Sequence, residues 1–444
     1  MNPGISLTFD IPVSTPLGVM LGVMVVTLLI RVPVAFAMIS SGMAYLIAKQ
    51  QDLGLVAEQI GNGLYNSYVL LAVPLFVLAA NIMNAGTVSE RIFDFCRLLV
   101  GRFRGGLAQV DILVSVVFSG MSGSAIADAA GPGLVTIRQM LKTGKYTPGF
   151  SGAIVVASAT IGPIIPPSIP MVIYALVSGT SVGALFLGGV VPGLLMAAVL
   201  MVAVHFIAVS RGMPQAAPVP RSEWPKVLFQ GILPLSLPIV LLTGIYSGAF
   251  TPTEAAGVAA LHALVLSVVV YRAFTWRSMF AVFLESTRSS AVIVMVIASA
   301  FILNYAFTSE GVPQGLAHWV AGQHLTALQF LLVVNALFLL LGCFLDTSVM
   351  LLVFVPMLLP AAQSLGIDLV HFGVIVIINM MIGLITPPFG MLLFVTSALT
   401  GIAMKDMVRE GWLFLLALLL LLFVLTIFPQ IVLWLPQSMG YGTR

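Results

Sequence analysis

The residues best suited to bind ligands lie in two short phrases of glycine and proline, each of which interrupts a long apolar run. Residues 161–167 read IGPIIPP, and residues 382–388 read IGLITPP at a matching place in the second half of the chain. A proline pair ends a helix, because proline lacks the backbone donor and clashes with the carbonyl one turn back. In lipid, freed backbone groups are tolerated only beside protein or a water-filled cavity. Paired breaks of this kind are typical of the binding sites of secondary transporters.

Each break follows a cluster of small and hydroxyl-bearing residues, Ser119–Ser124 (SGMSGS) before the first and Gly342–Ser348 (GCFLDTS) before the second. Small residues allow two backbones to approach closely. Hydroxyl, carbonyl and carboxylate oxygens are the ligands that hard cations prefer. The N-termini of half-helices at each break would point positive dipole ends at an anion. The four segments therefore predict a site that holds cations and a carboxylate in one small volume.

Other ionisable residues have simpler interpretations. Asp128 and Asp346 are carboxylates at membrane depth, where a charge is costly unless it is paired or bound to a cation. Asp346 lies in the second cluster and is the better cation ligand, whereas Asp128 could equally cap the helix after the first cluster. Glu254, three positions after Thr251, is expected to cap a helix, and Leu418 is expected to face lipid. The histidines expected only to pack in the core or at interfaces are His205, His262 and His371.

Composition indicates a membrane protein. Of 444 residues, 60% are hydrophobic and only 7% are charged, and the mean hydropathy is +1.14. Soluble domains carry roughly 25% charged residues. The net charge of +3 comes from scattered cations, so the sequence gives no indication of nucleic-acid binding. Cys96 and Cys343 have neither a local partner nor metal-ligand spacing, which indicates neither a disulfide framework nor a zinc site.

The apolar runs predict ten membrane spans, at residues 15–30, 34–48, 67–84, 148–178, 183–210, 227–247, 253–271, 289–307, 369–400 and 411–435. Segments 148–178 and 369–400 exceed one straight crossing of a hydrocarbon core about 30 Å thick. Each is therefore interpreted as two half-helices around a break. Segments 107–145 and 324–366 are interpreted as helical hairpins that enter the membrane and turn back.

The distribution of Lys and Arg sets the expected orientation. With the N-terminus outside, almost every Lys and Arg falls on the inside, which is the positive-inside pattern. Residues 1–210 and 227–435 then each contain five spans, one of them the broken helix, together with one hairpin, in the same order. A linker at 211–226 joins them on the inside, and a C-terminal tail follows at 436–444. An odd number of spans inverts the second half, so the prediction is an all-α membrane protein of two inverted repeats, a transporter design.

Two other functions were weighed on sequence features. Residues 120–123 (GMSG) match the Gly-x-Ser-Gly pattern of intramembrane serine proteases, but such a protease also needs a histidine facing the serine. One catalytic serine would not explain the second hairpin or the second proline pair. An ion channel is the other alternative, although paired breaks favour an enclosed site over a continuous pore.

The clusters and breaks together resemble the large membrane subunit of tripartite ATP-independent periplasmic (TRAP) transporters, the DctM-like family. The matching phrases are Ser122–Ser124 with Ala127-Asp128, Gly162 with Pro166–Ser168, Gly342 with Asp346, and Gly383 with Thr386–Gly390. The resemblance covers essentially the whole chain. It implies a non-enzymatic, elevator-type transporter in the bacterial inner membrane, with both termini in the periplasm and Na⁺ as coupling ion but no other cofactor. The implied partners are a small four-helix DctQ-like subunit, a periplasmic substrate-binding protein and membrane lipid. The implied cargo is an organic acid, such as a dicarboxylate or a sugar acid like sialic acid.

Carried onto this sequence, the resemblance places one Na⁺ between the first cluster and the first break, and a second Na⁺ between the second cluster and the second break. The implied cation ligands are Ser122, Gly123, Ser124, Gly162, Pro166, Gly342, Asp346, Gly383 and Thr386. The organic acid would lie between the two clusters. Because no arginine lies near either break, its carboxylate is expected to contact backbone amides and the residues Ser124, Ser168, Thr386 and Gly390.

Overall fold

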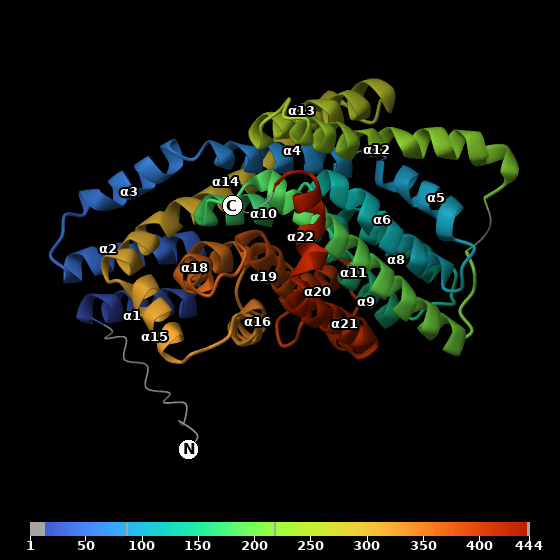
Figure 1. Cartoon of the computed structure of the whole chain (residues 1–444). Helices are drawn as coiled ribbons and strands as arrows, with labels where there is room; N and C mark the ends of the chain where they lie inside the picture. The colour runs from blue at the N-terminus through green and yellow to red at the C-terminus, as the bar shows by residue number, and fades with distance from the viewer. Residues whose placement is uncertain (1–13, 86–87, 217–218, 442–444) are drawn as a thin grey trace, which may run out of the picture.

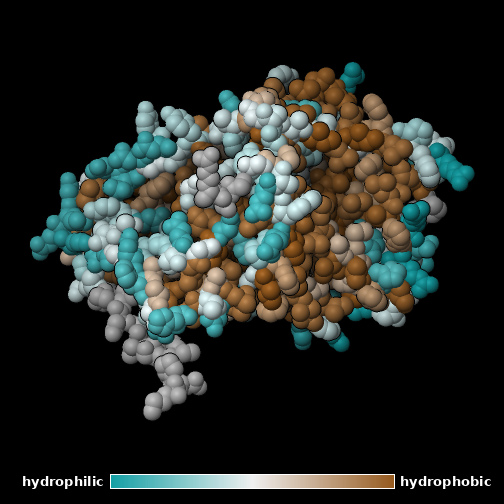
Figure 2. All heavy atoms as spheres, viewed as in Figure 1, coloured by the Kyte–Doolittle hydropathy of each residue, from teal (hydrophilic) through white to brown (hydrophobic). Residues whose placement is uncertain are grey.

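The computed structural model describes residues 14–85, 88–216 and 219–441. Within these ranges every regular element is helical and none is a β-strand, which confirms the all-α prediction. The face shown in Figure 2 carries a broad apolar area, the surface expected where lipid surrounds a bundle of helices.

Six helical segments precede the first cluster: α1 (Thr15–Leu29), α2 (Val34–Ala48), α3 (Gly54–Tyr65), η1 (Tyr68–Leu71), α4 (Ala72–Ala85) and α5 (Val88–Val100). The next helix, α6 (Gly106–Ser122), ends at the cluster, and the chain continues through α7 (Ala125–Asp128), the π-helical η2 (Ala129–Gly133) and α8 (Leu134–Lys142). The first break separates α9 (Pro148–Ala159) from α10 (Ile169–Ser178). The long helix α11 (Val182–Ser210) follows.

The second part repeats several of these features. It opens with η3 (Arg221–Glu223), α12 (Trp224–Tyr246), α13 (Pro252–Val265), η4 (Leu266–Val270), α14 (Trp276–Ser309) and α15 (Val312–Gly322). The second cluster joins α16 (Ala327–Gly342) to α17 (Thr347–Val349), the π-helical η5 (Met350–Phe354) and α18 (Val355–Ser364). The second break separates α19 (Leu369–Gly383) from α20 (Met391–Thr400), and α21 (Met404–Ile427) and α22 (Pro429–Ser438) end the described chain. Both proline pairs, Pro166–Pro167 and Pro387–Pro388, contain a cis peptide bond.

The described residues contain seven helical stretches long and apolar enough to cross a membrane, fewer than the ten spans expected. The spans expected at 15–30 and 34–48 form helices of 15 residues each, short of the roughly 20 that a straight crossing needs. The broken spans fall short because each break divides its apolar run into two helices. Conversely, Thr347–Ser364 lies inside the segment expected to be a hairpin, yet it is long enough to cross by itself.

Several boundaries differ from the prediction, and at α14 the reason is that polar residues interrupt the apolar run while the helix continues. Helix α14 begins at Trp276 rather than at 289, with Thr275 and Ser278 forming a reciprocal cap at its start. Helix α3 was not expected, and it buries no side chain. At the other end of the chain, α22 extends to Ser438, so the first residues of the expected tail at 436–444 are helical. Residues 1–13, 86–87, 217–218 and 442–444 lie outside the described chain.

Helices from early and late in the sequence pack together rather than forming two separate bundles. Helix α13 packs along α4, and α14 packs against α2 and α4. In Figure 1, α4, α12 and α13 lie along one edge, α1, α2, α14 and α15 at one end, and α6, α8, α9 and α11 at the other. The expectation that Leu418 faces lipid is wrong: it is 1% exposed inside the bundle, whereas Leu420 on the same helix is 58% exposed.

Candidate functional site

The first cluster lies directly against the first break. Gly123 has a φ of +59°, a backbone angle that glycine adopts without steric cost, and it ends α6. A Cβ atom built on Gly123 would lie 2.3 Å from the Pro167 carbonyl oxygen, so no larger residue fits there. On the other side of the contact, a Cβ atom on Gly162 would lie 3.4 Å from the Ser124 carbonyl oxygen. The backbones of the hairpin tip and the broken helix therefore touch.

The second cluster meets the second break through a pair of glycines. A Cβ atom built on Gly383 would lie 2.9 Å from the Cα of Gly342 and 3.2 Å from its carbonyl oxygen. The reciprocal distance, from a Cβ on Gly342 to the Cα of Gly383, is 3.2 Å. These distances are shorter than the optimal carbon contact of about 3.5–4.0 Å, so a Cβ atom at either position would force the two backbones apart. Two predicted residues far apart in sequence thus pack backbone to backbone.

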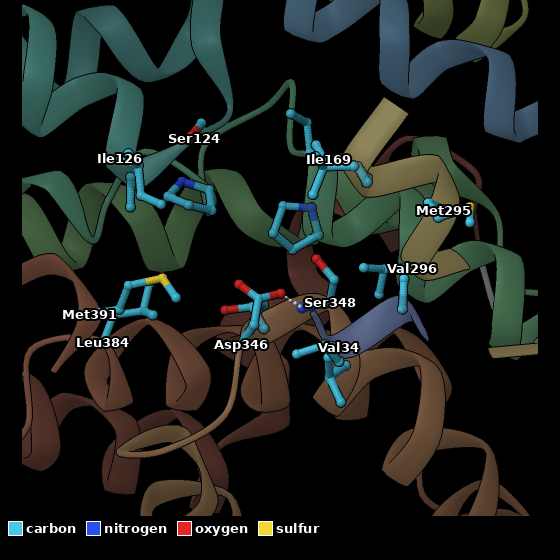
Figure 3. Close-up of a pocket in the computed structure, with 18 of the residues that line it drawn as sticks. Val34, Ser124, Ile126, Ile169, Met295, Val296, Asp346, Ser348, Leu384 and Met391 are labelled. Carbon is cyan, nitrogen blue, oxygen red and sulfur yellow. Dashed lines mark hydrogen bonds between the residues drawn. The ribbon is translucent and has the colours of Figure 1, made fainter. Parts of the chain in front are cut away.

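All four segments also border one cavity of about 670 Å³, a volume within the range of small-molecule sites. The first cluster and first break contribute Gly123, Ser124, Ala125, Ile126, Pro163, Ile169 and Pro170. The second cluster and second break contribute Asp346, Thr347, Ser348, Val349, Met381, Leu384 and Met391. In the view of Figure 3, Ser124 and Ile126 lie on the opposite side of the pocket from Asp346 and Ser348.

Two further walls of the cavity were not predicted. The start of α2 contributes Pro33–Phe36, and the middle of α14 contributes Ala291–Ile293, Met295 and Val296. Residues on α14 carry no sequence signal of function, because alanine, valine, isoleucine and methionine are ordinary lipid or core residues. The start of α2 could have been found, since Pro33 marks the start of a helix two residues after Arg31.

Helix N-termini surround the cavity. The first residues of α2, α7, α10, α17 and α20 all line it, namely Val34, Ala125, Ile169, Thr347 and Met391. The first amides of a helix lack intrahelical partners, and the helix dipole gives this end partial positive charge. Among the described residues that line the cavity, Asp346 alone carries a charged side chain, and none is basic. Five converging helix starts therefore supply the positive potential that basic side chains do not.

Two of the predicted polar residues cap these helices. The Ser124 hydroxyl accepts a hydrogen bond from the Ala127 amide at 3.3 Å, which starts α7. One oxygen of Asp346 accepts a hydrogen bond from the Ser348 amide at 2.8 Å, which starts α17, as drawn in Figure 3. Asp346 is only partly buried, so its carboxylate remains available to a ligand in the cavity. The cap of α7 is thus Ser124, and Asp128, which was considered for that role, lies at the end of α7 instead.

Other predicted residues lie beside the cavity but do not line it. Ser168 is fully buried, and its hydroxyl donates to the Pro163 carbonyl inside the break. The Thr386 hydroxyl donates to the Ile382 carbonyl at 2.7 Å, which closes the last turn of α19. Gly390, with a φ of +46°, turns the chain into α20. The predicted cation ligands that likewise lie behind the cavity wall are Ser122, Gly162, Pro166, Gly342 and Gly383.

The remaining sequence expectations have clear outcomes. Glu254 and Thr251 form the reciprocal cap predicted for α13. His371 Nε2 donates to the Leu425 carbonyl at 2.9 Å in the core, and His262 pairs with the Ser236 hydroxyl at 2.8 Å. The Ser122 hydroxyl, required as the nucleophile of a protease, is buried without any hydrogen-bond partner. No histidine activates it, so the geometry gives no support to the protease alternative.

The chain matches the family model described as "Tripartite ATP-independent periplasmic transporter, DctM component" over residues 21–431. It is 42% identical over 412 residues to the sialic acid TRAP transporter large permease protein SiaM of Vibrio cholerae, covering 92% of this chain and 96% of that protein. It is 41% identical over 373 residues to the C4-dicarboxylate TRAP transporter large permease protein DctM of Pseudomonas aeruginosa, covering 84% of this chain and 87% of that protein. These relatives are transport permeases rather than enzymes.

The fold is also similar to a solved membrane transporter. The crystal structure of the Alcanivorax borkumensis YdaH transporter superposes with a TM-score of 0.62 at 14% sequence identity, over 85% of this chain and 88% of that one. At this identity the similarity concerns the fold alone. The family match over nearly the whole chain, together with the predicted clusters and breaks, shows that this protein belongs to the DctM family of TRAP transporter large permeases, multi-pass membrane transporters of organic acids.

Proposed function

We propose that this chain imports an organic acid across the bacterial inner membrane, driven by Na⁺ moving in the same direction. In this proposal a periplasmic binding protein delivers the acid and a small DctQ-like subunit accompanies the chain in the membrane. Sialic acid and C4-dicarboxylates are the first substrates to test, because those are the acids named for the relatives at 42% and 41% identity.

The observation that carries the proposal is the convergence of five helix N-termini on a cavity whose described lining contains no basic side chain. Such ends bind carboxylates through free amides and the helix dipole. The small hydroxyl residues Ser124, on one side of the cavity, and Thr347 and Ser348, on the other, add hydrogen-bond donors. The apolar walls from α2 and α14 would contact the carbon skeleton of the acid.

Coupling to a cation is supported by the charge of Asp346. Its carboxylate borders the same cavity, and a substrate carboxylate placed nearby would be repelled in a medium of low dielectric constant. A cation held at the second cluster would remove this repulsion and leave the acid bound by the helix ends. The backbone contacts at Gly123 and at Gly342–Gly383 supply the close oxygen-bearing surfaces that two such cation sites require.

The elevator mechanism is supported by how the cavity is built. Each hairpin tip packs backbone to backbone on its own broken helix, so these four elements are suited to move as one body. The opposite wall comes from α2 and α14, which pack on one another, and α14 also packs on α4. We infer that the acid lies at the boundary between a moving unit and a fixed one, and that the repeated order of elements reflects two inverted repeats.

Reconstitution tests the proposal directly. Proteoliposomes containing this chain and its small subunit would be supplied with labelled sialic acid or succinate, with and without a loaded binding protein, in Na⁺ or choline. Uptake is expected only with an inward Na⁺ gradient and the binding protein. Robust uptake of free acid at micromolar concentration without the binding protein would refute the proposed delivery. Equal uptake in choline would refute the proposed coupling to Na⁺.

A further inference from the structure

A second polar cluster lies inside the first hairpin, away from the cavity lining. Asp111 on α6 and Asp128 on α7 are each 1% exposed. The Ser158 hydroxyl, from α9, donates to Asp111 Oδ2 at 2.7 Å. The Ser115 hydroxyl lies near the Asp128 carboxyl group, and Thr136 lies near that of Asp111. Three hydroxyl groups and two carboxyl groups thus lie in one neighbourhood inside the first hairpin, where the two carboxyl groups are close enough to interact.

No protein group balances these carboxyl groups. Among the described residues, neither Asp111 nor Asp128 belongs to an ion pair. The Oδ2 atom of Asp128 is buried and has no hydrogen-bond partner at all. Removing a carboxylate from water without compensation is energetically costly, and an unpaired carboxylate within a membrane protein marks a functional position. Asp128 therefore presents a free oxygen ligand in a site already rich in oxygen atoms.

The second half shows that the packing at this position needs no charge. Ser158 stands four residues before Gly162, as Asn379 stands four residues before Gly383. The Asn379 amide donates to both the backbone and the side-chain oxygen of Asn335, on the first arm of the second hairpin, each at 2.9 Å. The broken helix and hairpin are joined there by neutral side chains only.

Asp128 has an apolar counterpart as well. Asp128 follows the cap residue Ser124 by four positions, and Met350 follows the cap residue Asp346 by four positions. Met350 is fully buried. At the corresponding positions, the second hairpin thus packs with a neutral asparagine pair and a methionine. Packing alone therefore does not explain the two carboxyl groups of the first hairpin.

We propose that Asp128 holds a Na⁺ ion inside the first hairpin, separate from the two sites at the hairpin tips. The Asp128 carboxylate and the Ser115 hydroxyl supply ligands, and Asp111, oriented by Ser158, supplies the second negative charge. Oxygen ligands with carboxylate charge suit hard cations. The choice of Na⁺ rests on the proposed function, in which Na⁺ is the coupling ion, and the site adds one Na⁺ to those at the tips.

The test counts Na⁺ bound to the purified complex of this chain and its small subunit in detergent, by equilibrium binding of ²²Na⁺ without substrate. Asp128→Asn should bind one Na⁺ fewer per chain than the unmodified protein. Asp111→Asn, which can still accept the hydrogen bond from Ser158, should retain the site with an affinity about tenfold weaker, because ligand charge sets affinity. Asp406→Asn, at an exposed carboxylate on α21, is the matched control and should change nothing.

The proposal is overturned if Asp128→Asn binds as many Na⁺ ions as the unmodified protein. Gel filtration and circular dichroism show whether each variant is folded. Asp128→Glu keeps the charge, so it should retain the Na⁺ ion that Asp128→Asn loses. Because binding is measured without a gradient, its outcome is separate from the uptake assay. Na⁺-independent uptake would refute the proposed coupling, whereas the number of Na⁺ ions bound by Asp128→Asn would still decide whether Asp128 holds an ion.

Discussion

The contact between Gly342 and Gly383 gives the sharpest test of the cation site proposed at the second cluster. In Gly383→Ala, the new Cβ atom would lie 2.9 Å from the Gly342 Cα, 3.0 Å from its carbonyl carbon and 3.2 Å from its oxygen. All three are backbone atoms, so no side chain can rotate away. Carbon atoms settle at about 3.5–4.0 Å, and the hairpin tip must therefore move by roughly 0.5–1 Å away from the broken helix.

The expected cost follows from this displacement. Overpacking by one methyl group costs about 1–3 kcal/mol in a packed interior. If the contact also positions cation ligands, the same displacement separates the oxygen atoms of the hairpin from those of the break. Each 1.4 kcal/mol lost from the cation-bound state weakens binding tenfold. We therefore expect the Na⁺ concentration for half-maximal uptake to rise by about 5- to 100-fold.

Gly257→Ala is the matched control for this substitution. It also places alanine within a helix, but the nearest atom, Leu75 Cδ1, lies 3.9 Å from the new Cβ atom, an ordinary contact. The assay measures initial uptake against Na⁺ concentration in proteoliposomes, after confirming that each variant is monodisperse. Gly257→Ala should retain the unmodified Na⁺ dependence. The reasoning is refuted if folded Gly383→Ala gives the same half-maximal Na⁺ concentration as the unmodified protein.

Three further outcomes are expected. Asp346→Asn should raise the Na⁺ concentration needed for uptake at unchanged yield of membrane-inserted protein, and unchanged Na⁺ dependence would remove this carboxylate from the site. Hydrogen bonding from Lys49, at 2.6 Å, together with bonds from other side chains, lowers the pKa of Glu310 from 4.5 to about 2. The stabilisation by the Lys49–Glu310 pair is thus present above pH 4.5 and is lost as the pH falls toward 2. Over this pH range the unmodified protein should lose roughly 1 kcal/mol of unfolding free energy that Glu310→Gln does not lose, as measured by thermal unfolding. Leu418→Ala should destabilise the protein by about 2 kcal/mol or more and Leu420→Ala by under about 0.5 kcal/mol, and equal melting temperatures would contradict the burial difference.

The meeting of clusters and breaks could be predicted from sequence because few residue types permit it. Glycine is needed where two backbones touch, as at Gly342 and Gly383, and a proline pair is needed where a helix must stop inside an apolar run. These residue types can be recognised in the sequence without knowledge of what they contact. The pairing of each cluster with its own break also follows from the repeated order along the chain, and the structure brings Gly123 to the first break and Gly342 to the second.

Other parts of the site depend on contacts that no local pattern encodes. Ser168 and Thr386 have the right chemistry for a substrate, yet their hydroxyl groups bond to backbone carbonyls at the breaks. A hydroxyl beside a helix break can serve the backbone or a ligand, and only the three-dimensional path of the chain decides between them. Similarly, Leu418 and Leu420 lie in one leucine-rich run of α21. Because this run has no polar residues on its exposed face, the sequence does not show which face is buried.

In the proposed mechanism, the arrangement of charge around the cavity would make cation and substrate binding interdependent. Helix N-termini would attract an organic anion, while the Asp346 carboxylate in the same cavity would oppose it until a cation is bound. A cation that lowers the cost of placing the acid must itself be held more tightly once the acid is present, because coupling between two binding sites is reciprocal. Recognition through helix ends also demands only a carboxylate and not a particular skeleton. This gives a physical reason why permeases named for acids as unlike as sialic acid and C4-dicarboxylates can share this framework of tips and breaks.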